Sequence, residues 1–257
     1  MTVGFEVDDD IAVATLDRPE AMNAISGALA DDLREVMREV GSRPDIKVLV
    51  LTGAGDKAFC AGADLKERGT FELEDFIGNR RQMASMFQAL REVPQPSIAA
   101  VFGFTLGGGF ELALSCDLIV AADSTELGLP EARVGLVPGG GGTQLLPRKV
   151  GSSKAKELIF TGRRMSAQEA VALGLVARVV ARTELREAAL ALARDITRSS
   201  PVAVREAKRI VDATFGLGLE DAIALEGEAW SRVIATMDRA EGIAAFNEKR
   251  EPRWANR

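Results

Sequence analysis

The sequence has no histidine, no tyrosine and only two cysteines, Cys60 and Cys116, among its 257 residues. Without histidine the chain cannot form a Ser–His–Asp triad, a histidine-ligated metal site or a histidine acid or base. Two separated cysteines are too few for a four-thiolate zinc site, and we expect both to be reduced thiols. Proton transfer must therefore use Asp, Glu, Lys, Cys or water, and we expect no metal site.

The chain also lacks a basic segment, a signal peptide and an uninterrupted apolar run. Its formal net charge is −6, which disfavours nucleic acid and anionic membranes as partners. The longest apolar run, residues 97–122, is interrupted by a glycine triplet, Glu111 and Asp117, so it does not suit a membrane span. We therefore expect a cytoplasmic protein that binds neither nucleic acid nor membrane.

Apolar segments that alternate with amphipathic ones predict an α/β fold with a layered sheet. Residues 1–195 are expected to form the α/β core, and residues 196–257 a helical region that makes a subunit interface. The expected strands are residues 3–7, 11–16, 47–52, 97–101, 117–122 and 177–180, and the main expected helices are residues 26–40, 71–91, 107–116, 153–160, 185–198, 202–215 and 219–237.

The pattern Gly53-x-Gly55-x-x-Ala58 follows an expected strand and matches a dinucleotide-binding fingerprint. That fingerprint requires a helix to begin inside the motif, whereas residues 59–64 continue as a glycine-broken loop. The motif also lies at the third or fourth strand, and the fingerprint usually follows the first. The pattern alone is weak, and a nucleotide-dependent dehydrogenase is disfavoured.

The triplet Gly107–Gly109 lies at an expected strand-to-helix turn, just before Glu111. Amides at a helix start lack intrahelical partners and favour developing negative charge. Glu111 follows Gly108 by about one helical turn and so lies on the same face. The segment is compatible with an oxyanion site beside a carboxylate. Taken alone, however, it is better explained by tight packing of the glycines and a Glu111 that stabilises the helix dipole.

Glu131 lies in the loop after the next expected strand, and taken alone it is an ordinary loop acid. Successive strands of an α/β layer bring their loops to the same edge, so Glu131 is expected near Glu111. Two carboxylates with unequal burial could divide the roles of acid and base. The run Gly139–Gly142 lacks the lysine of a phosphate loop, and we interpret it as a turn packed near Glu131.

Four ordered segments together resemble the enoyl-CoA hydratase (crotonase) family over essentially the whole chain. They are residues 57–66 (KAFCAGADLK), 98–112 (IAAVFGFTLGGGFEL), 130–139 (PEARVGLVPG) and 241–250 (EGIAAFNEKR). The resemblance implies a crotonase-like ββα superhelical core with a C-terminal helical trimerisation region, and a homotrimer or hexamer. It implies an acyl-CoA thioester substrate, with coenzyme A as part of the substrate and no other cofactor.

Carried over to this sequence, the resemblance gives roles to individual residues. It implies that the amides of Ala63 and Gly108 bind the thioester oxygen, and that Glu111 and Glu131 are the catalytic acid and base of a hydratase. The residues implied to bind substrate or CoA are Ala21, Met22, Ala24, Ala61, Asp64, Leu65, Lys66 and, from a neighbouring subunit, Lys249. The expected acyl-pocket walls are Phe76, Met83, Met86, Phe87 and Phe110, the last standing where many short-chain hydratases have a smaller residue.

Members of the family catalyse several different reactions, and the sequence is compatible with three hypotheses. Retention of both glutamates favours hydration of a 2-enoyl-CoA. A Δ3–Δ2 enoyl-CoA isomerase needs a single base, for which Glu131 would suffice. A CoA-binding protein without catalytic activity would bind the thioester but not turn it over. The sequence does not specify the acyl chain.

Overall fold

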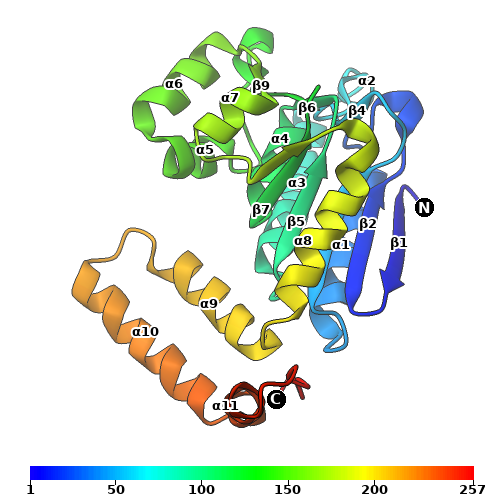
Figure 1. Ribbon diagram of the computed structural model, residues 1–257. Coiled ribbons are helices and arrows are strands. Elements are labelled where there is room, and N and C mark those ends of the chain that lie inside the picture. The colour runs from blue at the N-terminus through cyan, green and yellow to red at the C-terminus, as the bar shows by residue number, and fades with distance from the viewer.

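The computed structural model describes residues 1–257 as two β-sheets surrounded by helices, followed by a helical arm (Figure 1). The larger sheet has the strand order β1-β2-β3-β5-β7-β10, in which only the β1–β2 pair is antiparallel. The expected hairpin and buried strands are confirmed. The strands are β1 (Val3–Asp8), β2 (Ile11–Leu16), β3 (Val48–Gly53), β5 (Ser97–Val101), β7 (Leu118–Ala122) and β10 (Arg178–Val180).

Helices cover this sheet because each has one apolar stripe to bury. In α1 (Gly27–Ser42), the buried side chains recur at helical spacing, and Ser26 caps the helix by accepting from the Leu29 amide. Helix α1 packs against α3 (Leu73–Glu92), and α8 (Leu185–Thr197) packs on β3, β5 and β7. Both cysteines are buried and free, as expected.

A second, smaller sheet has the order β4-β6-β8-β9 and was not expected from the sequence. Its strands are β4 (Ala58–Cys60), β6 (Phe104–Leu106), β8 (Glu126–Gly128) and β9 (Met165–Ser166). Strands β4, β6 and β8 run parallel to one another, so their carboxyl ends lie at one edge. The segments singled out in the sequence follow these three strands directly.

The remaining core helices are short and lie near that edge or beside the small sheet. They are α2 (Leu65–Arg68), α4 (Gly108–Ser115), α5 (Gly142–Val150), α6 (Ser152–Thr161) and α7 (Ala167–Ala172), with 3-10 turns η1 (Pro19–Ala21), η2 (Glu131–Val134) and η3 (Arg182–Glu184). None of the helices combines the length and the apolar composition that a membrane crossing requires.

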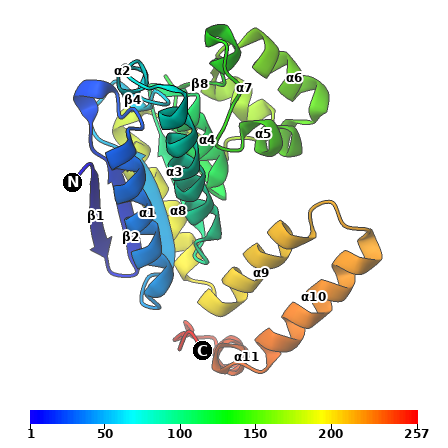
Figure 2. The ribbon, with the colours of Figure 1, turned by 180° about the vertical axis from the view of Figure 1, so that it is seen from behind.

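The C-terminal arm consists of α9 (Pro201–Thr214), α10 (Leu219–Ile234) and α11 (Met237–Glu248). Figures 1 and 2 show that these helices project away from the two-sheet core. An ion pair between Lys208 Nζ and Asp117, 2.8 Å long, ties α9 to the core. The expected boundary after residue 195 falls in the last turn of α8, just before the arm begins.

Candidate active site

Three segments meet at the carboxyl edge of the small sheet. Residues 61–63 follow β4, residues 107–108 follow β6, and residues 129–131 follow β8. They surround a cavity of about 400 Å³ that Ala63, Gly108, Glu111 and Glu131 all line. The expectation that loops from neighbouring strands converge is therefore confirmed. The strands themselves were wrongly identified, because the converging loops follow β6 and β8 rather than β5 and β7 of the larger sheet.

The amides of Ala63 and Gly108 lie side by side and are free to bind a ligand. A Cβ built on Gly108 would lie 3.8 Å from the Ala63 nitrogen, and one on Gly62 would lie 3.6 Å from the Gly108 nitrogen. Neither the Ala63 nor the Gly108 N–H donates to a protein acceptor. Gly108 is the first residue of α4 (Gly108–Ser115), so its N–H has no intrahelical partner. Two free, adjacent donors at a helix start are suited to hold a carbonyl oxygen that gains negative charge.

Gly107 allows this close approach of backbone segments. Its φ of 53° lies in the left-handed region that glycine adopts without strain, and its N–H donates to the Gly128 carbonyl at 2.9 Å. A Cβ at this position would lie 3.3 Å from Glu131 Oε1. A larger residue at position 107 would therefore strain the turn that precedes α4 and crowd the Glu131 carboxylate.

The Glu111 carboxylate is buried, with 3% of the residue exposed, and is held in place by backbone donors. Its Oε1 accepts the amide hydrogens of Gly140 at 2.7 Å and Gly142 at 2.8 Å. Burial raises the pKa of Glu111, while the N–H groups of Gly142 and Gly140 oppose that rise. One oxygen is thus fixed by the protein, which leaves the other as the oxygen that can act on a ligand.

The glycine run at residues 139–142 forms the other half of the Glu111 site. It was expected to pack near Glu131, but its amides bind Glu111 instead, which corrects the expectation. Arg91 supports the run by donating from Nη1 to the Gly140 carbonyl at 3.1 Å. A glycine run just before α5 was the only sequence signal for these donors, and nothing in it indicated which carboxylate they would reach.

The Glu131 carboxylate is bound quite differently, although it lines the same cavity. It is the first residue of η2 and is partly buried. Its Oε2 is shielded from solvent and has no hydrogen-bond partner in the protein. Burial raises the pKa of Glu131 to about 7, and the charge of Glu111 raises it as well, against the effect of its own backbone N–H. Near neutral pH this carboxyl group can both hold and release a proton.

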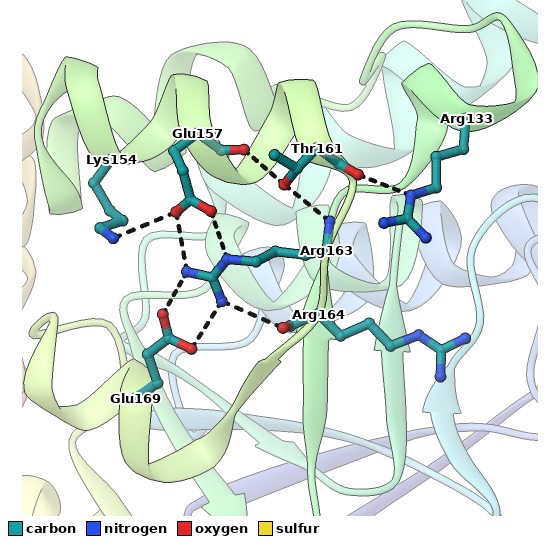
Figure 3. Close-up of polar contacts among 7 residues, drawn as sticks. All are labelled: Arg133, Lys154, Glu157, Thr161, Arg163, Arg164 and Glu169. Carbon is teal, nitrogen blue, oxygen red and sulfur yellow. Dashed lines mark hydrogen bonds and ion pairs between the residues drawn. The ribbon is translucent and has the colours of Figure 1, made fainter.

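Turn η2 is held in position by a polar network on α6 and α7 (Figure 3). Arg133 Nε donates to the Thr161 carbonyl, at the end of α6, over 2.8 Å. Arg163, two residues after Thr161, forms ion pairs with two glutamates. Its Nε lies 2.5 Å from Glu157 Oε1, and its Nη2 lies 2.6 Å from Glu169 Oε1. The exposed ion pairs contribute little energy each. They nonetheless fix the end of α6 against which η2 rests.

Several of the residues expected to bind CoA lie on adjoining segments beside the oxyanion amides. The Ala61 amide donates to the Met22 carbonyl at 3.0 Å, which places the loop containing Ala21 and Ala24 against residues 61–64. Ala61 lines the cavity, and so does Leu65, which is exposed.

Three further residues of this set have other positions. Asp64 caps α2 by accepting from the Lys66 and Glu67 amides and pairs with Arg18 at 2.9 Å. Lys66 is exposed on α2. Lys249 follows α11 on the arm and does not line the cavity of its own chain.

The residues that line the cavity include only some of the expected acyl-pocket walls. Phe76, Met83 and Phe87 line it. Met86 and Phe110 do not, because both are fully buried in the core. The expectation that Phe110 shapes the pocket is wrong. The structure adds polar lining residues for which the sequence gave no signal: Arg68, Asn79, Arg80 and Arg133.

The fingerprint-like residues Gly53 and Gly55 do not form a phosphate loop. The chain turns after β3 directly into β4, and no helix begins inside the motif. A Cβ on Gly53 would lie 2.6 Å from the Phe59 carbonyl oxygen, so this glycine serves the turn between the two strands. The dinucleotide interpretation is therefore excluded at this motif.

Comparisons with known proteins find similar proteins of one family over nearly the whole chain. The family model described as enoyl-CoA hydratase/isomerase matches residues 6–257. The short-chain-enoyl-CoA hydratase of Clostridium acetobutylicum is 39% identical over 252 residues, which cover 96% of this chain and 95% of that protein. The human mitochondrial enoyl-CoA hydratase domain-containing protein 2 is 42% identical over 254 residues, with 97% and 87% covered. The crystal structure of enoyl-CoA hydratase from Bacillus anthracis aligns with a TM-score of 0.98 at 41% identity, and 100% of both chains is covered.

Proposed function

The chain belongs to the enoyl-CoA hydratase/isomerase family, and we propose that within it the protein adds water across the 2,3 double bond of a 2-enoyl-CoA thioester. The observation that carries the proposal is the presence of two carboxylates, Glu111 and Glu131, in one cavity with the free amides of Ala63 and Gly108. Hydration moves two protons and passes through an enolate-like oxygen. Two acid–base groups and two oxyanion donors match that requirement.

In the proposed mechanism, Ala63 and Gly108 donate to the thioester oxygen and stabilise the charge that develops there. The free oxygen of Glu111 accepts a proton from water as the water oxygen bonds to Cβ. The protonated Glu131 gives its proton to Cα as the enolate collapses to the thioester. A proton then returns from Glu111 to Glu131 through solvent, which restores both groups. Coenzyme A is part of the substrate, and the scheme needs no further cofactor.

The difference between the two carboxylates supports this division of roles. Glu111 has one oxygen held by two amides, which fixes its orientation and opposes the rise in its pKa that burial causes. Glu131 has an oxygen without a partner and a pKa of about 7, as suits a group that must carry a proton at neutral pH.

Δ3–Δ2 enoyl-CoA isomerisation is the second candidate, and the environment of Glu131 favours it. A single carboxyl group with a pKa of about 7 can take a proton from C2 and return it at C4. In that reaction Glu111 would have no proton to move. A CoA-binding protein without turnover is a third, weaker candidate, and it gives no reason for two carboxylates at the oxyanion site.

We also propose that the arm joins copies of this chain into a homotrimer or hexamer. The arm exposes large apolar side chains, with Leu219 72%, Trp230 64% and Phe246 83% exposed. Lys249 would then meet the CoA phosphates bound by a neighbouring copy. Light scattering at micromolar concentration should give the mass of three or six chains, and a monomeric mass would reject this assembly.

The proposed reaction is tested by following the loss of the conjugated enoyl-thioester absorbance with crotonyl-CoA. We expect the absorbance to fall and 3-hydroxybutyryl-CoA to form. A gain of that absorbance from a 3-enoyl-CoA, with no loss from crotonyl-CoA, would establish isomerisation instead. Binding of crotonyl-CoA without either change would favour the non-catalytic role.

A further inference from the structure

The cavity carries more positive than negative side chains, although the chain as a whole has a net charge of −6. Its acidic lining residues are Glu111 and Glu131, whereas three arginines line it: Arg68, Arg80 and Arg133. None of the three forms an ion pair with a carboxylate of the protein. Arg80 and Arg133 are exposed to solvent, and Arg133 already donates to the Thr161 carbonyl. Arg68 is therefore the one of the three whose charge an apolar acyl chain does not explain, and its partner is expected to be an anionic part of the ligand.

Arg68 is the arginine among them that is best placed to bind such a group. Its side chain makes one hydrogen bond in the protein, from Nη2 to Asn79 Oδ1 at 3.0 Å, and its other N–H groups have no acceptor. Burial lowers the pKa of Arg68, a cost that the charges of Glu67 and Glu111 partly offset. A half-buried guanidinium with unused donors is suited to pair with a planar carboxylate.

Asn79 completes the arrangement from helix α3. It is 8% exposed and lines the cavity, and its Oδ1 is occupied by Arg68. Its side-chain amide nitrogen donates to no protein acceptor. Its side-chain N–H groups are therefore available to a ligand in the cavity that accepts hydrogen bonds. The Arg68–Asn79 contact thus presents two sets of donors to the same cavity.

We propose that the preferred acyl group carries a carboxylate at its distal end, and that Arg68 and Asn79 bind this carboxylate. The preferred substrate class is then the mono-CoA thioester of an unsaturated dicarboxylic acid. The proposal rests on the enoyl-CoA function proposed above and specifies its substrate.

The position of Arg68 favours an acyl carboxylate over a CoA phosphate. The thioester oxygen is placed at Ala63 and Gly108, and the double bond lies beside Glu111. Arg68 lines the same cavity as Glu111 and the free amides of Ala63 and Gly108. The phosphates of CoA lie at the far end of the pantetheine arm. The neighbouring Glu67 does not form an ion pair with Arg68, because its carboxylate accepts a hydrogen bond from the Gly27 amide at 3.1 Å.

The test compares two substrates that share CoA and differ only in the charge of the acyl end. Glutaconyl-CoA carries the distal carboxylate, and trans-5-methylhex-2-enoyl-CoA replaces it with an isopropyl group of similar shape. We expect the wild type to show a kcat/KM about 10-fold or more higher for glutaconyl-CoA. Arg68→Met should lower the ratio of the two values about 10- to 100-fold, the range for a lost hydrogen-bonded charge pair.

Arg81→Met is the matched control, because Arg81 lies on α3, is exposed and lines no part of the cavity. It should leave the substrate ratio unchanged. If Arg68→Met lowers kcat/KM equally for both thioesters, then Arg68 binds CoA or supports the fold, and the proposal is overturned. A wild type that prefers the isopropyl substrate would overturn it as well.

A binding measurement separates this proposal from the proposed reaction. Calorimetry with the saturated analogues glutaryl-CoA and 5-methylhexanoyl-CoA needs neither turnover nor a variant. Tighter binding of glutaryl-CoA would support the carboxylate site even if no enoyl-CoA is hydrated, in which case only the proposed reaction fails. Equal binding, or tighter binding of 5-methylhexanoyl-CoA, would overturn the carboxylate site even in an active hydratase.

Discussion

The two sides of the cavity present the same functional group in opposite environments. On the α4 side, Glu111 is buried and one of its oxygens accepts two amide hydrogens from the facing glycine run. On the η2 side, Glu131 lies in a short turn, and one of its oxygens is buried without a partner. The protein therefore fixes one carboxylate and leaves the other able to exchange its proton.

This difference follows from backbone geometry rather than from residue type. Amides that converge on an oxygen stabilise its charge, whereas burial without donors favours the neutral acid. A shared cavity with two such environments separates an acceptor for the proton of water from a donor to Cα.

The largest effect is expected from removing either acid–base group. Glu111→Gln and Glu131→Gln should each lower kcat for hydration by about 10²–10⁴, the usual contribution of a positioned acid or base. Binding of the CoA thioester should change little, since the cavity and the amides remain. A variant of either residue with near-wild-type kcat would contradict that residue's role.

Hydrogen exchange distinguishes the two variants from each other. Glu131 is proposed to act at Cα, so Glu111→Gln should still exchange the Cα hydrogen of butyryl-CoA with D₂O, as measured by mass spectrometry. Glu131→Gln should lose this exchange. If the pattern is reversed, the roles assigned to the two sides of the cavity must be exchanged.

A smaller loss is expected from the oxyanion amide. Gly108→Pro removes one N–H at the first position of α4, where proline is tolerated, and should lower kcat by about 10²–10³. Far-UV circular dichroism should show that the protein is folded. A folded Gly108→Pro protein with full activity would remove this N–H from the mechanism.

The two carboxylates should also differ in their effect on stability. Glu111→Leu leaves the amides of Gly140 and Gly142 without an acceptor, at about 1–3 kcal/mol for each buried donor. Denaturant unfolding should show this loss. An unchanged midpoint would mean that the glycine run finds other partners.

Glu131→Leu, in contrast to Glu111→Leu, is expected to increase the stability of the protein at pH 8. The folded-state pKa of about 7 is above that of an unfolded glutamate, so the wild type loses stability as pH rises from about 4.5 to about 7. The leucine variant lacks this loss, and its Tm relative to wild type should be higher at pH 8 than at pH 5. A relative Tm that does not change with pH would indicate an unshifted Glu131.

The larger sheet and most helices could be predicted because their segments are long enough to show a period. The hairpin and α1 are examples, each with regularly spaced buried side chains. The small sheet could not be predicted, because β4, β6 and β8 have only three residues each. Helix α4 is buried on nearly every side, so no amphipathic pattern showed that Phe110 faces the core.

The candidate site could be predicted as a set of residues but not as an arrangement. The residue pattern indicated Gly108, Glu111 and Glu131, and the family resemblance added Ala63. The structure places all four around one cavity. The contacts that distinguish the two carboxylates join residues about 30 positions apart, such as Gly140 and Glu111. Such contacts depend on how the two sheets pack, and a linear pattern does not contain that information.

The most direct test of the contrast between the carboxylates is the pH dependence of kcat/KM for crotonyl-CoA hydration. If Glu131 supplies its proton to Cα, kcat/KM should fall above about pH 7, approaching about tenfold for each further pH unit, as this group ionises. That decline should be absent from the residual activity of Glu131→Gln. A wild-type kcat/KM that stays constant or rises between pH 6.5 and 8.5 would contradict the assignment of Glu131 as the proton donor.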